Sequence, residues 1–116
     1  MRAVHEPVDL AHLARYTGGD ARLDAQVLSL FVRQSVEALA RLRALCVAPQ
    51  RKTWRDSLHT LKGSAMGIGA VALAEQLAAA ESIDPETAPA KAVAALEAIE
   101  RVSGLVNTFV AAYLAQ

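Results

Sequence analysis

The sequence is poor in several residue types that mark particular classes of protein. Cys46 is the only cysteine among 116 residues, so no intramolecular disulfide can form and an oxidising compartment is not indicated. No apolar run reaches the roughly 18 residues that a membrane span requires. Lysine plus arginine and aspartate plus glutamate number 12 each, so no surplus charge favours nucleic acid or a membrane surface as a partner. Residues 1–10 hold two acids and a proline, so we expect no secretory signal and a cytoplasmic protein.

Alanine and leucine dominate the 53% of residues that are hydrophobic, and both are strong helix formers. Aromatic residues make up only 4%, and the β-branched residues are too scattered for repeated strands. Glycines and prolines divide the chain into segments whose apolar residues recur at helical spacing. Asp20 is a suitable N-cap after two glycines, and Pro49 suits the first turn of a helix. The predicted helices cover about residues 8–16, 20–47, 50–66, 70–83 and 89–115.

These segments predict an all-α fold in a single domain over residues 1–116. Four amphipathic helices with short connections pack most simply as an antiparallel up-down-up-down four-helix bundle, with the short additional N-terminal helix covering one end. Gly67 is expected to supply the left-handed residue that closes the third helix, with Ile68 folding back onto the core. The expected core consists of Leu10, Leu13 and Tyr16; Leu23, Val27, Leu30, Phe31, Ala38, Leu42 and Leu45; Trp54, Leu58, Leu61 and Ala65; Val71, Ala74, Leu77 and Ala78; and Val93, Leu96, Ile99, Val106, Phe109 and Tyr113.

His59 differs from the other two histidines in its place on a predicted helix. It follows Leu58 at the edge of the buried stripe, so its side chain is expected to face outward. Gly63, one turn later, has a helix-propensity cost of about 1 kcal/mol relative to alanine and leaves room for another protein's surface. A solvated surface histidine is the commoner explanation from composition alone, but it does not account for this glycine. The same exposed ridge is expected to carry Lys52, Arg55, Lys62 and Met66.

The charges are unevenly distributed along the chain. Six cations lie between Arg41 and Lys62 against one anion, Asp56, whereas six anions lie between Glu75 and Glu100 against one cation. A local basic face on a neutral protein suits an acidic partner or a phosphate group.

The sequence lacks the common motifs of metal-binding sites, catalytic nucleophiles and phosphate-binding loops. The sequence contains no HExxH, CxxC or GxSxG pattern and no phosphate-cradling glycine loop. His5 and His12 lie in the N-terminal segment without further ligands nearby in the sequence, so no metal site is predicted. We therefore expect no cofactor in this chain and no self-sufficient enzyme.

An extended motif surrounds His59. It reads His59-Thr60-Leu61-Lys62-Gly63-Ser64-Ala65, followed by Ile68-Gly69-Ala70 and Leu73, and it is preceded by Gly19-Asp20 with Leu23, Leu28 and Phe31. Together with Leu77 and Glu81, these residues resemble the signature of histidine-containing phosphotransfer (HPt) domains of two-component phosphorelays, over about residues 8–116. Two positions depart from the family pattern: Leu58 replaces a frequent alanine, and Gly67 a frequent asparagine.

The resemblance implies that His59 accepts and donates a phosphoryl group through one ring nitrogen. Lys62 is similar to the family's lysine that offsets phosphoryl charge, and Glu81 lies where the family supplies a side chain that bonds the other ring nitrogen. Gly63 matches the small residue that admits a receiver domain. The expected docking face comprises Lys52, Arg55, Gly63, Ser64 and Met66.

The expected partners are response-regulator receiver domains, with a hybrid sensor histidine kinase as a second candidate. Mg²⁺ is expected in the receiver, not in this chain, and the chain is expected to be a free-standing monomeric phosphocarrier. One alternative is a degenerate HPt-like bundle that docks a receiver or kinase without carrying phosphate. Another, a small helical hydrolase or metalloprotein, lacks a set of ligands or a nucleophile.

Overall fold

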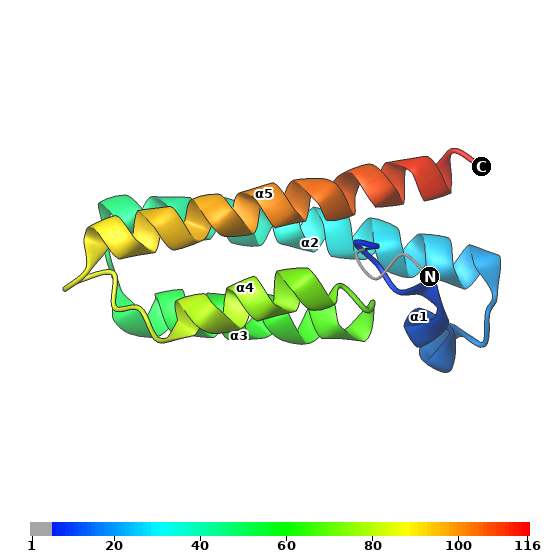
Figure 1. The fold of residues 1–116 in the computed structure, drawn as a ribbon, viewed down its shortest axis with the longest axis horizontal. Helices are drawn as coiled ribbons and strands as arrows, with labels where there is room; N and C mark the ends of the chain where they lie inside the picture. The colour runs from blue at the N-terminus through cyan, green and yellow to red at the C-terminus, as the bar shows by residue number, and fades with distance from the viewer. Residues whose placement is uncertain (1–5) are drawn as a thin grey trace.

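The computed structural model describes residues 6–116, and over these residues the chain forms five helices and no strand (Figure 1). The predicted all-α class is therefore confirmed, and the observed helix bounds differ from the predicted ones by at most two residues. His5 lies outside the described residues. The helices are α1 (Leu10–Thr17), α2 (Ala21–Val47), α3 (Arg51–Gly67), α4 (Val71–Glu81) and α5 (Pro89–Leu114).

Local chemistry accounts for several of the helix starts. The Asp20 side chain accepts hydrogen bonds from the backbone N–H groups of Arg22 and Leu23, as expected of an N-cap. Pro89 begins α5, where its missing N–H costs no helical hydrogen bond. The prediction for Pro49 was wrong, because the N-cap of α3 is Gln50 and the proline lies one residue before it.

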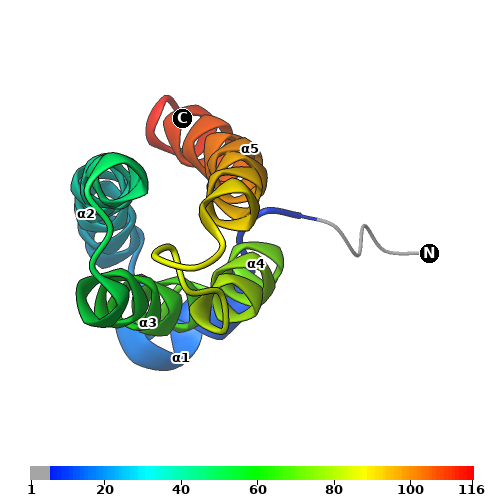
Figure 2. The ribbon, with the colours of Figure 1, turned by 90° about the vertical axis from the view of Figure 1, so that its left-hand side faces the viewer.

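Helices α2 to α5 enclose one core. Contacts join α2 to α3, α3 to α4, α4 to α5 and α5 back to α2, and Figure 2 shows these four helices end-on around the interior. The α2 and α5 helices have 27 and 26 residues, whereas α3 and α4 have 17 and 11. The shorter pair therefore covers only part of the longer pair, and α1 lies beside α2 beyond the α3–α4 turn (Figure 1).

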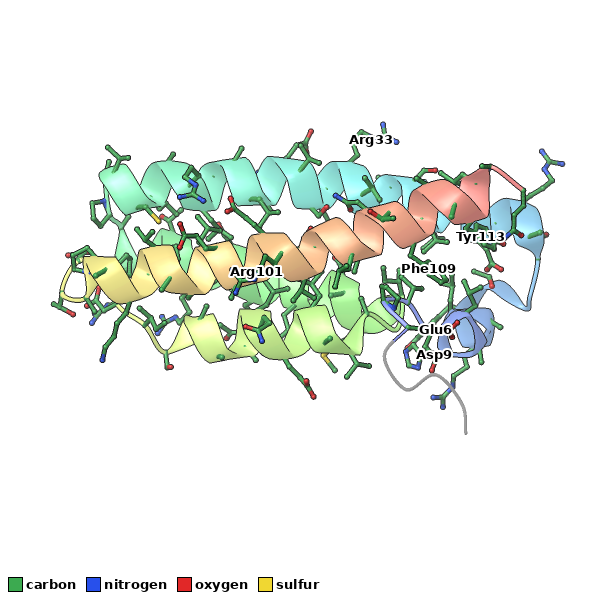
Figure 3. The ribbon with its side chains drawn as sticks, turned by 45° about the horizontal axis from the view of Figure 1, so that its top comes forward. Glu6, Asp9, Arg33, Arg101, Phe109 and Tyr113 are labelled. Atoms are coloured by element: carbon green, nitrogen blue, oxygen red, sulfur yellow. The ribbon has the colours of Figure 1, made fainter. Side chains whose placement is uncertain are left out.

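The buried residues follow the predicted stripes, with corrections. The third-helix stripe is confirmed, since Trp54, Leu58, Leu61 and Ala65 are all 0–1% exposed. Phe109 and Tyr113 of α5 are half-buried and pack against the core at the end where α1 lies (Figure 3). The predictions were wrong for residues that flank a stripe or lie at a helix end, which are exposed: Tyr16, Leu23, Leu30, Val71 and Ala78. Their places are taken by Val8, Leu28, Leu73 and Ala80, which are fully buried.

The turn between α3 and α4 also differs from the prediction. Gly67 is the last residue of α3 and has no positive φ, whereas Gly69 has φ 74°. The helix continues one residue further than expected, and the left-handed residue comes after Ile68, whose side chain is buried as predicted. The carbonyl of Gly69 accepts a hydrogen bond from the Asp9 backbone N–H at 3.1 Å, so this turn also holds the start of α1.

Within residues 6–116, none of the helices combines the length and apolar character needed to cross a bilayer.

Candidate functional site

His59 lies in the middle of α3 on the side away from the core. Leu58 and Leu61 are 0% and 1% exposed, whereas the His59 side chain is 70% exposed. A step of about 100° per residue turns His59 out of the stripe that its neighbours bury. The packing of α3 thus holds an imidazole in solvent on a rigid backbone.

Two further charged groups meet His59 on one side. Glu81, the last residue of α4, brings its Oε1 atom to 3.5 Å from His59 Nδ1. Its Oε2 atom lies 2.9 Å from the Nζ atom of Lys62, one turn after His59 on α3. The Glu81 and Lys62 side chains are only 20% and 24% exposed, so both ends of this ion pair are partly shielded from water. The structure therefore brings together the three residues that the sequence singled out.

The Lys62 ammonium holds the pKa of Glu81 below its ordinary value, although burial acts in the opposite direction. Glu81 is thus a carboxylate at neutral pH. A carboxylate beside Nδ1 favours the imidazole tautomer that carries its proton there, which leaves the lone pair on Nε2. At 3.5 Å the contact lies at the long limit for a hydrogen bond.

Gly63 is not required by the protein's own packing. A Cβ atom placed on it would meet no other heavy atom within 4 Å, and its φ is not positive. Neither crowding nor backbone conformation explains a residue that weakens a helix by about 1 kcal/mol relative to alanine. The surface one turn from His59 is therefore open.

The remaining residues of the predicted docking face differ in their exposure and in their contacts. The Lys52 ammonium pairs with the Asp56 carboxylate at 2.6 Å, so part of the expected positive charge is balanced on α3 itself. Arg55 and Met66 are exposed as predicted. Ser64 is half-buried and its hydroxyl donates to the Thr60 carbonyl at 3.4 Å, so it lies to one side of the ridge.

Ser64 opens onto a groove that the sequence interpretation missed. The groove lies between α1, α2 and α3, has a volume of about 290 Å³ and has a mainly apolar lining. Its rim includes Tyr16 and Leu30, which are 69% and 59% exposed. Both residues had been assigned to the core because they follow helical spacing. Spacing alone does not separate the centre of a buried stripe from its edge.

The part of the chain that the structure covers, residues 6–116, shows no cluster of three or more His, Cys, Asp or Glu side chains that could hold a metal ion. His12 lies on α1, where its ring and that of Tyr16 are arranged edge to face with 5.7 Å between ring centroids.

The fold and the site together place this protein in a class of small helical domains that expose one histidine beside a lysine and a carboxylate. The family model described as Hpt domain matches residues 26–108, and the chain belongs to that family. The matched range includes His59, Lys62 and Glu81 but excludes α1. Hpt domains are phosphocarrier modules of histidine phosphotransfer relays and interact with receiver domains and kinases. Comparisons with curated proteins and with solved structures find no match.

Proposed function

We propose that this protein carries a phosphoryl group on His59, which it accepts from and donates to receiver-domain aspartates. One observation carries the proposal: the imidazole is 70% exposed, yet its Nδ1 atom faces the Glu81 carboxylate, and that carboxylate also binds Lys62. An ordinary surface histidine has no need of a half-buried acid on a neighbouring helix.

In the accepting step, the lone pair of His59 Nε2 attacks the phosphorus of an aspartyl phosphate. The bond between phosphorus and the aspartate oxygen breaks, and the receiver's carboxylate leaves with the electron pair. Glu81 holds the proton on Nδ1 and stabilises the positive charge that develops on the ring, as the acid of a catalytic triad does. Lys62, one turn after His59 on α3, is proposed to offset phosphoryl charge. Donation is the reverse step, and such transfers depend mainly on positioning and charge neutralisation.

The receiver is proposed to approach across Gly63, where the surface is open. Arg55, Lys52 and Met66 extend this face along α3, and Ser64 leads to the apolar groove beside it. Mg²⁺ would come with the receiver's own acidic pocket. A hybrid sensor histidine kinase is proposed as a second partner, which would exchange the same phosphoryl group with His59.

The rest of the proposal concerns the whole molecule. We propose an antiparallel up-down-up-down bundle acting as a monomer, an arrangement supported by the short connections and by the closed ring of helix contacts. A single domain and a cytoplasmic location stay predictions from the sequence.

The test is phosphate acceptance by a His59→Gln variant. Incubation with a receiver carrying ³²P on its aspartate should label the wild type with an acid-labile, base-stable phosphate, as expected of phosphohistidine. His59→Gln should take no label and keep the wild-type circular dichroism spectrum, because the side chain is exposed. His12→Gln on α1 is the matched control and should be labelled normally. Labelling of His59→Gln would refute the assignment, and an unlabelled wild type that still binds the receiver would favour a docking module without phosphate.

A further inference from the structure

The position of Glu81 depends on contacts outside its own helix. The α4 helix has 11 residues, and its N-cap residue Ala70 makes no side-chain capping hydrogen bond. At the other end, the exposed Ser82 hydroxyl donates to the Ala79 carbonyl at 3.2 Å. Ser82 is also in the right-handed conformation, so no left-handed residue closes the helix. Helices this short are marginal in isolation, and their last turns fray. Glu81 is the last residue of this helix, so its place must be fixed by packing.

A buried hydrogen bond from α3 supplies this fixation. The indole Nε1 of Trp54 donates to the backbone carbonyl of Ala80 at 3.1 Å, and both residues are 0% exposed. The Ala80 carbonyl is one of the last four of α4, which have no partner within the helix, and it also accepts from the Ile83 backbone N–H at 3.1 Å in the turn that follows. The Ile83 bond is local to the turn, whereas the indole bond ties the end of α4 to α3, so its net contribution favours this position of the helix end.

A second, more exposed connection acts on the segment after Glu81. The backbone N–H of Arg51 donates to the Glu86 carboxylate at 3.0 Å, and the Arg51 guanidinium lies 3.8 Å from Asp84 Oδ2. Gln50, the N-cap of α3, makes no capping bond of its own, so Glu86 caps α3 from another part of the chain. These exposed contacts are screened by water and contribute less than the buried indole bond.

We propose that Trp54 is a positioning residue for phosphotransfer, acting through Glu81. Trp54 and His59 are five residues apart on one rigid helix, an axial distance of about 7.5 Å. Trp54 holds the residue directly before Glu81, so the indole bond fixes how far the carboxylate reaches toward His59 Nδ1. Without this bond the end of α4 keeps the Ile83 and Ser82 hydrogen bonds and the Lys62–Glu81 ion pair but is less firmly placed. The carboxylate then spends more time away from the ring, and less of the imidazole keeps its proton on Nδ1. This inference rests on the proposed function for its kinetic consequence, but not for its effect on the ring.

Trp54 is the only tryptophan in the chain, so an analogue can be placed at this site alone. β-(3-Benzothienyl)alanine keeps the shape of the indole and replaces its N–H with sulfur, which cannot donate. Two quantities are measured: the ¹⁵N chemical shifts of the His59 ring nitrogens, which report the tautomer, and the single-turnover rate of transfer from a phosphorylated receiver. We expect the Nδ1–H fraction to fall and the rate to drop about fivefold, the factor to which one net hydrogen bond corresponds.

Two comparisons separate positioning from a general loss of stability. Ile99→Val loosens the core from α5, a helix that carries none of His59, Lys62, Glu81 and Trp54, and should leave the tautomer and rate unchanged. In a Glu81→Ala background the analogue should have no further effect, because Trp54 acts through that carboxylate. Wild-type ring shifts and rate in the analogue protein would overturn the proposal, as would an equal rate loss with Glu81 absent. Failure of the wild type to take label would instead contradict the proposed function, and the ring shifts would still test the role of Trp54.

Discussion

Replacing Gly63 should change stability and phosphotransfer in opposite directions. Its backbone is helical and no heavy atom lies within 4 Å of an added Cβ, so a side chain meets only solvent in the free protein. Gly63→Ala and Gly63→Leu should each raise the free energy of unfolding by about 0.8–1 kcal/mol, the helix-propensity difference. For a domain of this size that corresponds to a rise of about 4 °C in Tm.

Transfer should respond to the size of the side chain. Leucine places a branched side chain on the surface that the receiver is proposed to cover, and overpacking of this kind costs about 1–3 kcal/mol. The second-order rate of transfer from a phosphorylated receiver should therefore fall about tenfold or more in Gly63→Leu. Gly63→Ala should lose much less. Rates measured at sub-saturating receiver, together with thermal unfolding followed by circular dichroism, give both quantities on the same samples.

Gly104 offers a matched control. It lies within α5, is exposed, and also has no heavy atom within 4 Å of an added Cβ. Gly104→Leu should stabilise the protein to a similar degree and leave transfer unchanged. If Gly63→Leu transfers as fast as the wild type, the receiver does not approach across this surface. If both leucine variants slow transfer equally, the effect comes from rigidity and not from docking.

Two further predictions concern charge and backbone conformation. Because Lys62 lowers the pKa of Glu81, their ion pair stabilises the fold above the ordinary carboxyl value of 4.5 and is lost as the pH falls through the lowered value. The stability difference between wild type and Lys62→Met, measured by urea unfolding, should be present at pH 7 and shrink below pH 4.5; a difference that persists unchanged in acid would contradict the pairing. Gly69→Ala should destabilise the fold by about 2 kcal/mol or more, since φ is 74° and the new Cβ would lie 2.7 Å from Asp9 Cβ. Gly67→Ala, which meets nothing within 4 Å, should be neutral or slightly stabilising, and equal losses in the two variants would refute the assigned turn.

The sequence predicted most of the fold because helical periodicity and capping chemistry agree along this chain. Asp20 caps α2 as its position suggests, and the stripe that contains Trp54 is buried. Gly67 could not be separated from Gly69 in advance, because either glycine can end a helix and the choice depends on where Asp9 packs. The prediction that Leu30 is buried was wrong for a related reason: an apolar residue at the edge of a stripe is buried only if a neighbouring helix covers it.

The site was predictable in its residues but not in its electrostatics. His59, Lys62 and Glu81 follow from the family resemblance, and the structure places them within contact distance. That Lys62 already pairs with Glu81 could not be seen from a spacing of 19 positions, since this contact depends on how α4 packs against α3. The indole bond of Trp54 was hidden for the same reason, as its periodicity indicates only a buried side chain.

The pairing of Lys62 with Glu81 also bears on the thermodynamics of a relay. An intermediate must take a phosphoryl group from one aspartate and pass it to another, so neither transfer can be strongly downhill into the histidine. A free ammonium beside His59 would bind the arriving dianion tightly and retain it. Here the Glu81 carboxylate offsets part of that charge, so the phosphoryl group meets a less positive site than a free lysine would make. Under the proposed function, the ion pair keeps the equilibrium constant for each exchange nearer to one, and the carrier stays ready to give as well as to receive.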